Sequence, residues 1–138
     1  MAQDAFGALV DALSRRDLTS AELEQRLLQA GFEPSACSEA LARAADAGYL
    51  DDTRVAVERA RHLAERDASD AAIRAELERR GASDEDVEIA LSKVTPEPER
   101  AERLAARLGG GARAARALTR KGYSDDLVER TIRLHIAE

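Results

Sequence analysis

This sequence of 138 residues has no tryptophan, one cysteine and an aromatic content of only 3%. A single cysteine excludes an intramolecular disulfide and fits a reducing compartment. No apolar run approaches the ~18 residues of a membrane span and no signal-peptide pattern is present, so we expect a soluble, cytoplasmic protein without a membrane partner. No stretch alternates apolar and polar residues as a strand does. Ala, Leu, Arg and Glu are abundant, which favours an all-helical fold.

A pattern centred on three glycines repeats along the chain. Gly31, Gly81 and Gly122 each have a leucine four residues before them and apolar residues six and ten residues after them. Spacings of four place side chains on one face of a helix. Each glycine fits the left-handed residue that ends a helix, because it has no Cβ to clash. We therefore predict positive φ at each glycine and a buried leucine in each copy, namely Leu27, Leu77 and Leu118.

A further helix precedes each copy, so the repeated unit consists of three helices. In the first copy the helices are expected at residues 4–16, 20–30 and about 34–46. A unit of this size buries too little apolar surface to be stable alone, so neighbouring units must stack. The predicted fold is all-α, with three tandem three-helix repeats in an elongated, curved arrangement. The repeats are predicted at residues 1–48, 49–95 and 96–138.

No group of residues has the spacing of a catalytic centre or a metal site. Asp51 and Asp52 are adjacent acids, but without a histidine or a third carboxylate at ligand spacing we expect them to cap a helix. The acids Asp84–Asp86 lack the other ligands of a calcium loop. The glycines 109–111 are not followed by the Lys-Ser/Thr of a phosphate-binding loop. We therefore expect no enzyme activity, no small-molecule substrate, and no metal or other cofactor.

The net charge of −6 is distributed unevenly along the chain. Residues 1–48 carry 4 basic and 8 acidic side chains, residues 49–95 carry 8 and 12, and residues 96–138 carry 9 and 7. The segment Arg103–Ser124 contains no carboxylate, so its basic residues are candidates for contact with an acidic partner or with phosphate groups. They are Arg103, Arg107, Arg113, Arg116, Arg120 and Lys121. The competing interpretation is a solvated helix face.

A second basic helix, in the middle repeat, supplies Arg54, Arg59 and Arg61 as further candidates for partner or nucleic-acid binding. It follows a segment of unusual composition, G-Y-L-D-D at Gly48–Asp52.

Several segments resemble the RecX family of recombination regulators. They are Gly48–Asp52 with the following Arg54-Val55-Ala56, Ser14–Leu27 (SRRDLTSAELEQRL), Ile73–Gly81 (IRAELERRG) and Leu118–Ser124 (LTRKGYS). The resemblance implies a regulatory protein of recombination, DNA repair and the SOS response. Such a protein would bind the RecA recombinase filament, lie in its helical groove, and restrain its ATP hydrolysis and strand exchange. Some relatives also bind DNA, so single- or double-stranded DNA is a further expected partner.

The chain departs from this family pattern at three places. Val55 stands where family members usually have an aromatic residue. The basic Gly-Pro-Arg-like segment before the middle helix of the second repeat is replaced by residues 64–70, and the tryptophan near the start of the third repeat is absent. The lost basic segment favours the protein partner over DNA. Two alternatives stay open: a helix-turn-helix-like DNA-binding protein, and a helical repeat module for another protein partner.

Overall fold

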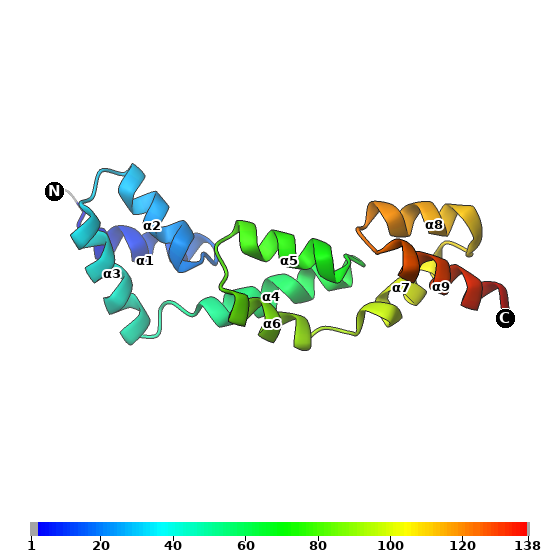
Figure 1. Ribbon diagram of the computed structural model, residues 1–138. Helices are drawn as coiled ribbons and strands as arrows, with labels where there is room; N and C mark the ends of the chain where they lie inside the picture. The colour runs from blue at the N-terminus through cyan, green and yellow to red at the C-terminus, as the bar shows by residue number, and fades with distance from the viewer. Residues whose placement is uncertain (1–2, 138) are drawn as a thin grey trace.

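The computed structural model describes residues 3–137, and over this range the chain forms nine helices and no strand. In chain order they are α1 (Ala5–Arg15), α2 (Ser20–Gln29), α3 (Pro34–Asp46), α4 (Asp52–Glu65), α5 (Asp70–Arg79), α6 (Asp84–Ser92), α7 (Glu97–Arg107), α8 (Gly111–Arg120) and α9 (Asp125–Ala137). Figure 1 shows them as three consecutive groups in an elongated, gently curved row, with the two ends of the chain far apart. The predicted all-α fold of three tandem repeats is confirmed.

We call the groups module 1 (α1–α3), module 2 (α4–α6) and module 3 (α7–α9). The helix pairs in most extensive contact all lie within one module. Each module also has its own cluster of buried apolar side chains. The three repeated leucines, Leu27, Leu77 and Leu118, are buried in these clusters as predicted. Repeat boundaries after residues 48 and 95 stay a prediction. Within residues 3–137 no helix is long and apolar enough to cross a membrane.

The middle helix of modules 1 and 2 begins at a side-chain cap. The Thr19 hydroxyl accepts a hydrogen bond from the backbone N–H of Glu22, whose carboxylate accepts one from the N–H of Thr19. This is a capping box, which satisfies two N–H groups that the first turn of a helix cannot pair internally. Ser69 caps α5 by accepting from the N–H of Ala72. In module 3 the equivalent residue is Gly110, which has no side chain to cap α8.

The three repeated glycines have φ of +96°, +89° and +97°, as predicted. Two of them have a second requirement that the sequence did not reveal. A Cβ on Gly81 would lie 2.5 Å from the Cβ of Ala21, and one on Gly122 would lie 2.6 Å from Oγ of Ser69. Gly31 has no such neighbour within 4 Å. Gly81 and Gly122 therefore also mark the places where the preceding module packs closely against the chain.

Candidate functional site: the two joints and the basic face of α8

Modules 1 and 2 meet where the N-terminus of α2 packs against module 2, and we call this contact joint 1. The Thr19 hydroxyl donates to the carbonyl of Arg80 over 2.6 Å, and the backbone N–H of Ser20 donates to Oδ1 of Asp52 over 2.8 Å. The first bond ends at the turn after α5, and the second at the start of α4. The N-terminus of α2 is thus hydrogen-bonded to module 2 at two separate places.

Modules 2 and 3 meet in the same way, at what we call joint 2. The backbone N–H of Ser69 donates to the carbonyl of Lys121 over 3.3 Å, and that of Asp70 donates to Oε2 of Glu97 over 2.6 Å. Ser69 and Lys121 stand at the same places of their repeats as Thr19 and Arg80. Residues at equivalent positions of the sequence repeat therefore make equivalent contacts between modules.

Arg100 lies in the interior of joint 2, and its side chain is 0% exposed. Its Nε donates to the carbonyl of Ala68 over 3.1 Å, Nη1 to the carbonyl of Thr95 over 2.5 Å, and Nη2 to Oδ1 of Asp70 over 2.6 Å. A buried guanidinium is tolerated only when its donors are paired in this manner. Sequence analysis counted Arg100 only as a charge and missed this role.

Asp67 is the second buried charge of joint 2, with its side chain 1% exposed. Its backbone has φ of +65°, an unusual value for a residue that is not glycine. Its carboxylate accepts a hydrogen bond from Nε of Arg103 over 3.1 Å and forms an ion pair with Arg107 over 2.7 Å. Two candidate residues of the basic segment thus neutralise an acid of the preceding module. Their contact with a partner stays a prediction.

Tyr123 closes the interior of joint 2. Its hydroxyl donates to the carbonyl of Asp67 over 2.7 Å. Burial raises the pKa of Tyr123 to about 12, although the nearby positive charge of Arg100 acts in the opposite direction. The phenol therefore stays protonated, as a donor, throughout the physiological pH range.

Joint 1 is held instead by partly exposed ion pairs. Arg80 donates to both carboxylate oxygens of Glu22, over 3.2 and 3.4 Å. Burial acts to raise the pKa of Glu22, but hydrogen bonds from the backbone of Thr19 and from Arg80 outweigh it and hold the pKa below its ordinary value. Arg54 contacts Asp17 and Glu58, both over 3.4 Å. Exposed pairs of this length contribute little to stability, on the order of 0–1 kcal/mol.

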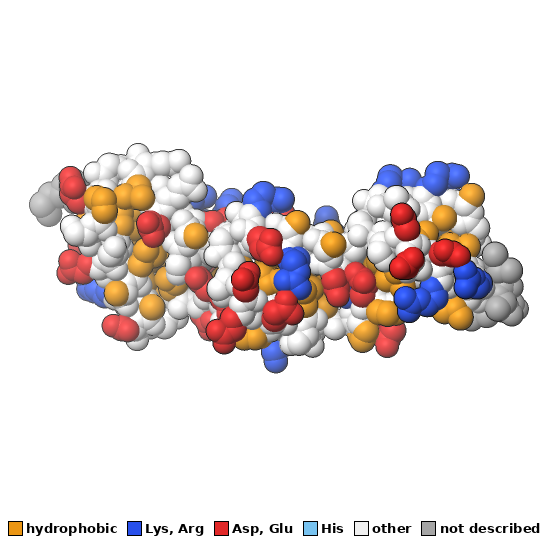
Figure 2. Space-filling view, in the orientation of Figure 1, with side chains coloured by type: hydrophobic (Ala, Val, Ile, Leu, Met, Phe, Trp, Pro, Cys, Tyr) orange, Lys and Arg blue, Asp and Glu red, His pale blue; other side chains and the backbone are white. Residues whose placement is uncertain are grey.

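The remaining candidates are exposed, apart from the half-buried Arg59. Arg59 pairs with Glu76 over 3.2 Å, whereas Arg61 makes no ion pair with any residue in the described range. The same holds for Arg113, Arg116, Arg120 and Lys121, and we call these four side chains the basic face of α8. Figure 2 shows Lys and Arg side chains along the outer edge of α8. Ala114 and Leu118, on the opposite side of the helix, are buried in the core of module 3.

The residues 3–137 bring together no group of three or more His, Cys, Asp or Glu side chains in a metal-binding arrangement. The fold and its surfaces therefore define a class of protein: a stacked array of three-helix repeats with a basic helix face on its last module.

Comparison with known proteins shows which family the chain resembles. A family model described as "RecX, first three-helix domain" matches residues 5–43. Two proteins named "Regulatory protein RecX", from Xanthomonas axonopodis pv. citri (strain 306) and Xanthomonas citri, are each 39% identical to this chain over 90 residues. Each alignment covers 65% of this chain and 53% of the relative, so the chain spans about half the length of the curated relatives it matches.

Solved structures share the fold over nearly the whole chain. The crystal structure of RecX from Lactobacillus salivarius has a TM-score of 0.80 and 24% sequence identity, and the match covers 97% of this chain and 96% of that one. A second crystal structure of regulatory protein RecX has a TM-score of 0.77 and 23% identity, with 92% and 70% covered. Over residues 5–43 the chain matches the RecX family model, and over nearly its whole length it has the fold of the RecX crystal structures.

Proposed function

We propose that this chain is a non-catalytic cytoplasmic regulator that binds the RecA recombinase filament and restrains its ATP hydrolysis and strand exchange. The proposal is supported by the similarity to proteins named regulatory protein RecX and by the segments that carry the resemblance, above all Gly48–Asp52. The basic face of α8 is the observation on which it chiefly depends. These four cations have no carboxylate partner within the described chain, although carboxylates outnumber basic residues elsewhere in it.

The shape of the molecule supports a partner that is itself extended. Three modules stacked in a row form an elongated molecule (Figure 1). A ligand that spans several subunits of a filament can bind through many weak contacts, because each contact raises the effective concentration of the next. The paired joints hold the modules in a fixed order, so the contacts are presented together.

Charge reversal on α8 tests the proposal. The variant Arg113→Glu, Arg116→Glu and Arg120→Glu is expected to abolish inhibition of RecA-catalysed ATP hydrolysis on single-stranded DNA. It should retain the circular dichroism and thermal midpoint of the wild type, because exposed substitutions usually change stability by within about 0.5 kcal/mol. Arg103 and Arg107 are left unchanged in this variant, because they hold the buried Asp67.

A matched control reverses three exposed arginines elsewhere: Arg15→Glu, Arg26→Glu and Arg66→Glu. It changes the net charge by the same amount and should still inhibit. Equal inhibition by wild type and by the folded α8 variant would exclude the basic face of α8 as the contact. Absence of inhibition by the wild type at saturating concentration would contradict the recombinase function itself.

DNA binding is the second candidate, because the basic face of α8 also fits phosphate groups. If this face neutralised three to four phosphates, the logarithm of the binding constant would fall by about 3 to 4 units per tenfold rise in salt concentration. A DNA titration at several salt concentrations with RecA absent separates this function from the first. The third possibility, a helical repeat module for another protein, is favoured if neither RecA nor DNA is bound.

A further inference from the structure

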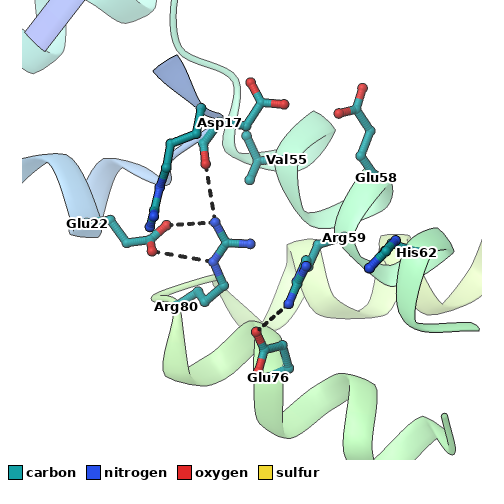
Figure 3. A pocket seen from close by; sticks show the side chains of 9 residues that line it. Asp17, Glu22, Val55, Glu58, Arg59, His62, Glu76 and Arg80 are labelled. Carbon is teal, nitrogen blue, oxygen red and sulfur yellow. Dashed lines mark hydrogen bonds and ion pairs between the residues drawn. The ribbon is translucent and has the colours of Figure 1, made fainter. Parts of the chain in front are cut away.

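An open pocket of about 600 Å³ lies at joint 1, between modules 1 and 2. Its walls come from the segment that follows α1 and from helices α2, α4 and α5, with the turn after α5, as Figure 3 shows. The pocket contains side chains of both charges around the apolar surface of Val55. None of the residues that carry the proposed filament contact on α8 takes part in it.

Comparison with joint 2 explains why this space is open. Val55 comes three residues after Asp52, the acid that accepts from the N-terminus of α2, and Arg100 comes three residues after the equivalent Glu97. Joint 2 is filled by the buried Arg100 and by Tyr123. Valine and alanine stand at the equivalent places of joint 1, namely Val55 and Ala82. The two joints thus make contact at the same repeat positions, but joint 1 has an open pocket where joint 2 has two large buried side chains.

Two arginines on one side of this pocket have donors to spare. Arg80 uses Nε and Nη2 for Glu22 and for the carbonyl of Asp17, and Arg59 uses Nη2 for Glu76. Nε of Arg59 is buried and has no hydrogen-bond acceptor among the described residues. Figure 3 shows both guanidinium groups below Val55, with that of Arg80 turned toward Glu22 and that of Arg59 toward Glu76, and with the His62 ring beside Arg59. Nη1 of each arginine makes no hydrogen bond with a described residue, so a carboxylate in the pocket can accept from these two groups.

The opposite side of the pocket is acidic and exposed to water. The carboxylates of Asp17 and Glu58 have side chains 48% and 52% exposed, and Arg54 is their shared partner. The surrounding residues 1–95 carry 12 basic and 20 acidic side chains, the sum of 4 and 8 with 8 and 12. A nucleic-acid strand crossing this rim would bring successive phosphates against like charges. A single anionic group at the end of a flexible side chain can extend past these exposed carboxylates and reach the arginines.

From this geometry we infer that the pocket binds one carboxylate of an acidic side chain on a partner protein. The carboxylate accepts from Arg59 and Arg80, and the aliphatic stem of the guest side chain packs on Val55. Hydrogen bonds between a guanidinium and a carboxylate are charge-assisted and directional, so two arginines at one point select a carboxylate over an amide. The site is separate from the basic face of α8, and it gives modules 1 and 2 a contact of their own.

The test uses the whole chain and two short blocked peptides, Ac-Gly-Glu-Leu-NH2 and Ac-Gly-Gln-Leu-NH2, which differ only in the carboxylate. Arginine Nε–Hε signals and backbone amides are followed by ¹⁵N NMR during titration. The glutamate peptide should shift the Nε signals of Arg59 and Arg80, with a dissociation constant in the millimolar range expected for one ionic contact. The glutamine peptide should leave both signals unchanged.

Two variants and a control locate the site. Arg59→Gln should weaken the glutamate peptide at least tenfold, whereas Arg66→Gln, at the exposed end of the same helix, should change its affinity less than twofold. Val55→Arg places the joint 2 residue in joint 1, and it should abolish peptide binding by filling the pocket. A backbone spectrum that matches the wild type shows that each variant is folded.

Equal shifts with both peptides, no shift with either, or unchanged affinity in folded Arg59→Gln would each overturn the inference. Larger shifts of the same signals with a short thymidine oligonucleotide would also overturn it, in favour of a phosphate site. Because RecA is absent and the signals of Arg59 and Arg80 report on joint 1 rather than on α8, failure of this inference is distinguishable from failure of the proposed function.

Discussion

Joints 1 and 2 make contact at the same repeat positions but hold very different interiors. In both, the N-terminus of a middle helix meets the glycine turn and the first helix of the following module. Joint 2 is filled by Arg100, Asp67 and Tyr123, all buried, whereas joint 1 has an open pocket bordered by partly exposed ion pairs. The comparison teaches that the stacking of the modules is set by hydrogen bonds at the same repeat positions in both joints. The interior of a joint is therefore free to vary and to take on a binding role.

The largest expected effect comes from removing the buried cation of joint 2. Arg100→Ala leaves two carbonyls and Asp70 without their partner, and should lower the free energy of unfolding by about 3–5 kcal/mol. Val55→Ala, at the equivalent position of joint 1, should cost only about 1.5 kcal/mol, from two methyl groups at about 0.8 each. Urea denaturation of both variants measures the difference. Equal losses would contradict the contrast drawn between the joints.

A substitution in a module core allows the stability contributed by a joint to be compared with that contributed by a module interior. Leu77→Ala empties a site in module 2 that is 2% exposed, and it should cost about 2–4 kcal/mol because the surrounding helices cannot fully collapse. The same urea series provides the measurement. If Leu77→Ala left the midpoint unchanged, the helical register that buries the repeated leucines would be wrong.

The repeated glycines allow a turn that packs against a neighbouring module to be compared with a turn that does not. Gly31→Ala should cost about 1–2 kcal/mol, because an L-residue is disfavoured at positive φ. Gly122→Ala should cost more, because its Cβ would also lie 2.6 Å from Oγ of Ser69 across joint 2. Thermal midpoints of the two variants, measured together, test the order. A larger loss for Gly31→Ala would argue against close packing at the joint.

The smallest expected effect is a pH dependence of joint 1. The pKa of Glu22 is lower in the folded protein than its ordinary value of 4.5. A depressed carboxyl pKa stabilises the fold above pH 4.5, and this contribution is lost as the pH falls through the folded-state pKa. Glu22→Gln should therefore lose less stability than the wild type between pH 5 and about pH 3. Parallel pH profiles in the two proteins would show that the Glu22–Arg80 pair does not act in this way.

Local features of the fold could be predicted from the sequence. Helix ends, the left-handed Gly31, Gly81 and Gly122, and the buried leucines depend on residues within one or two turns, where spacing and capping rules act directly. The Thr19–Glu22 capping box is such a case. The described helices begin and end within a residue or two of where the periodicity placed them.

The interior of joint 2 could not be predicted in the same way. Asp67 and Arg103 are 36 residues apart, and their pairing arises only when module 3 stacks on module 2. A weak signal was present: Arg100, Arg103 and Arg107 share one face of α7, whereas the equivalent residues of α4 are Val55, Glu58 and His62. This difference in residue type between α7 and α4 indicates that the two joints have different interiors. It does not show which of the arginines would be buried.

The most direct test of the proposed function is co-sedimentation with RecA filaments assembled on single-stranded DNA, with and without nucleotide. The wild-type chain and the Arg15, Arg26 and Arg66 reversal should both pellet with the filament, whereas the Arg113, Arg116 and Arg120 reversal should stay in the supernatant. DNA alone, without RecA, should not carry the chain into the pellet. Wild-type protein that remains in the supernatant at saturating filament, in both nucleotide states, would contradict the account.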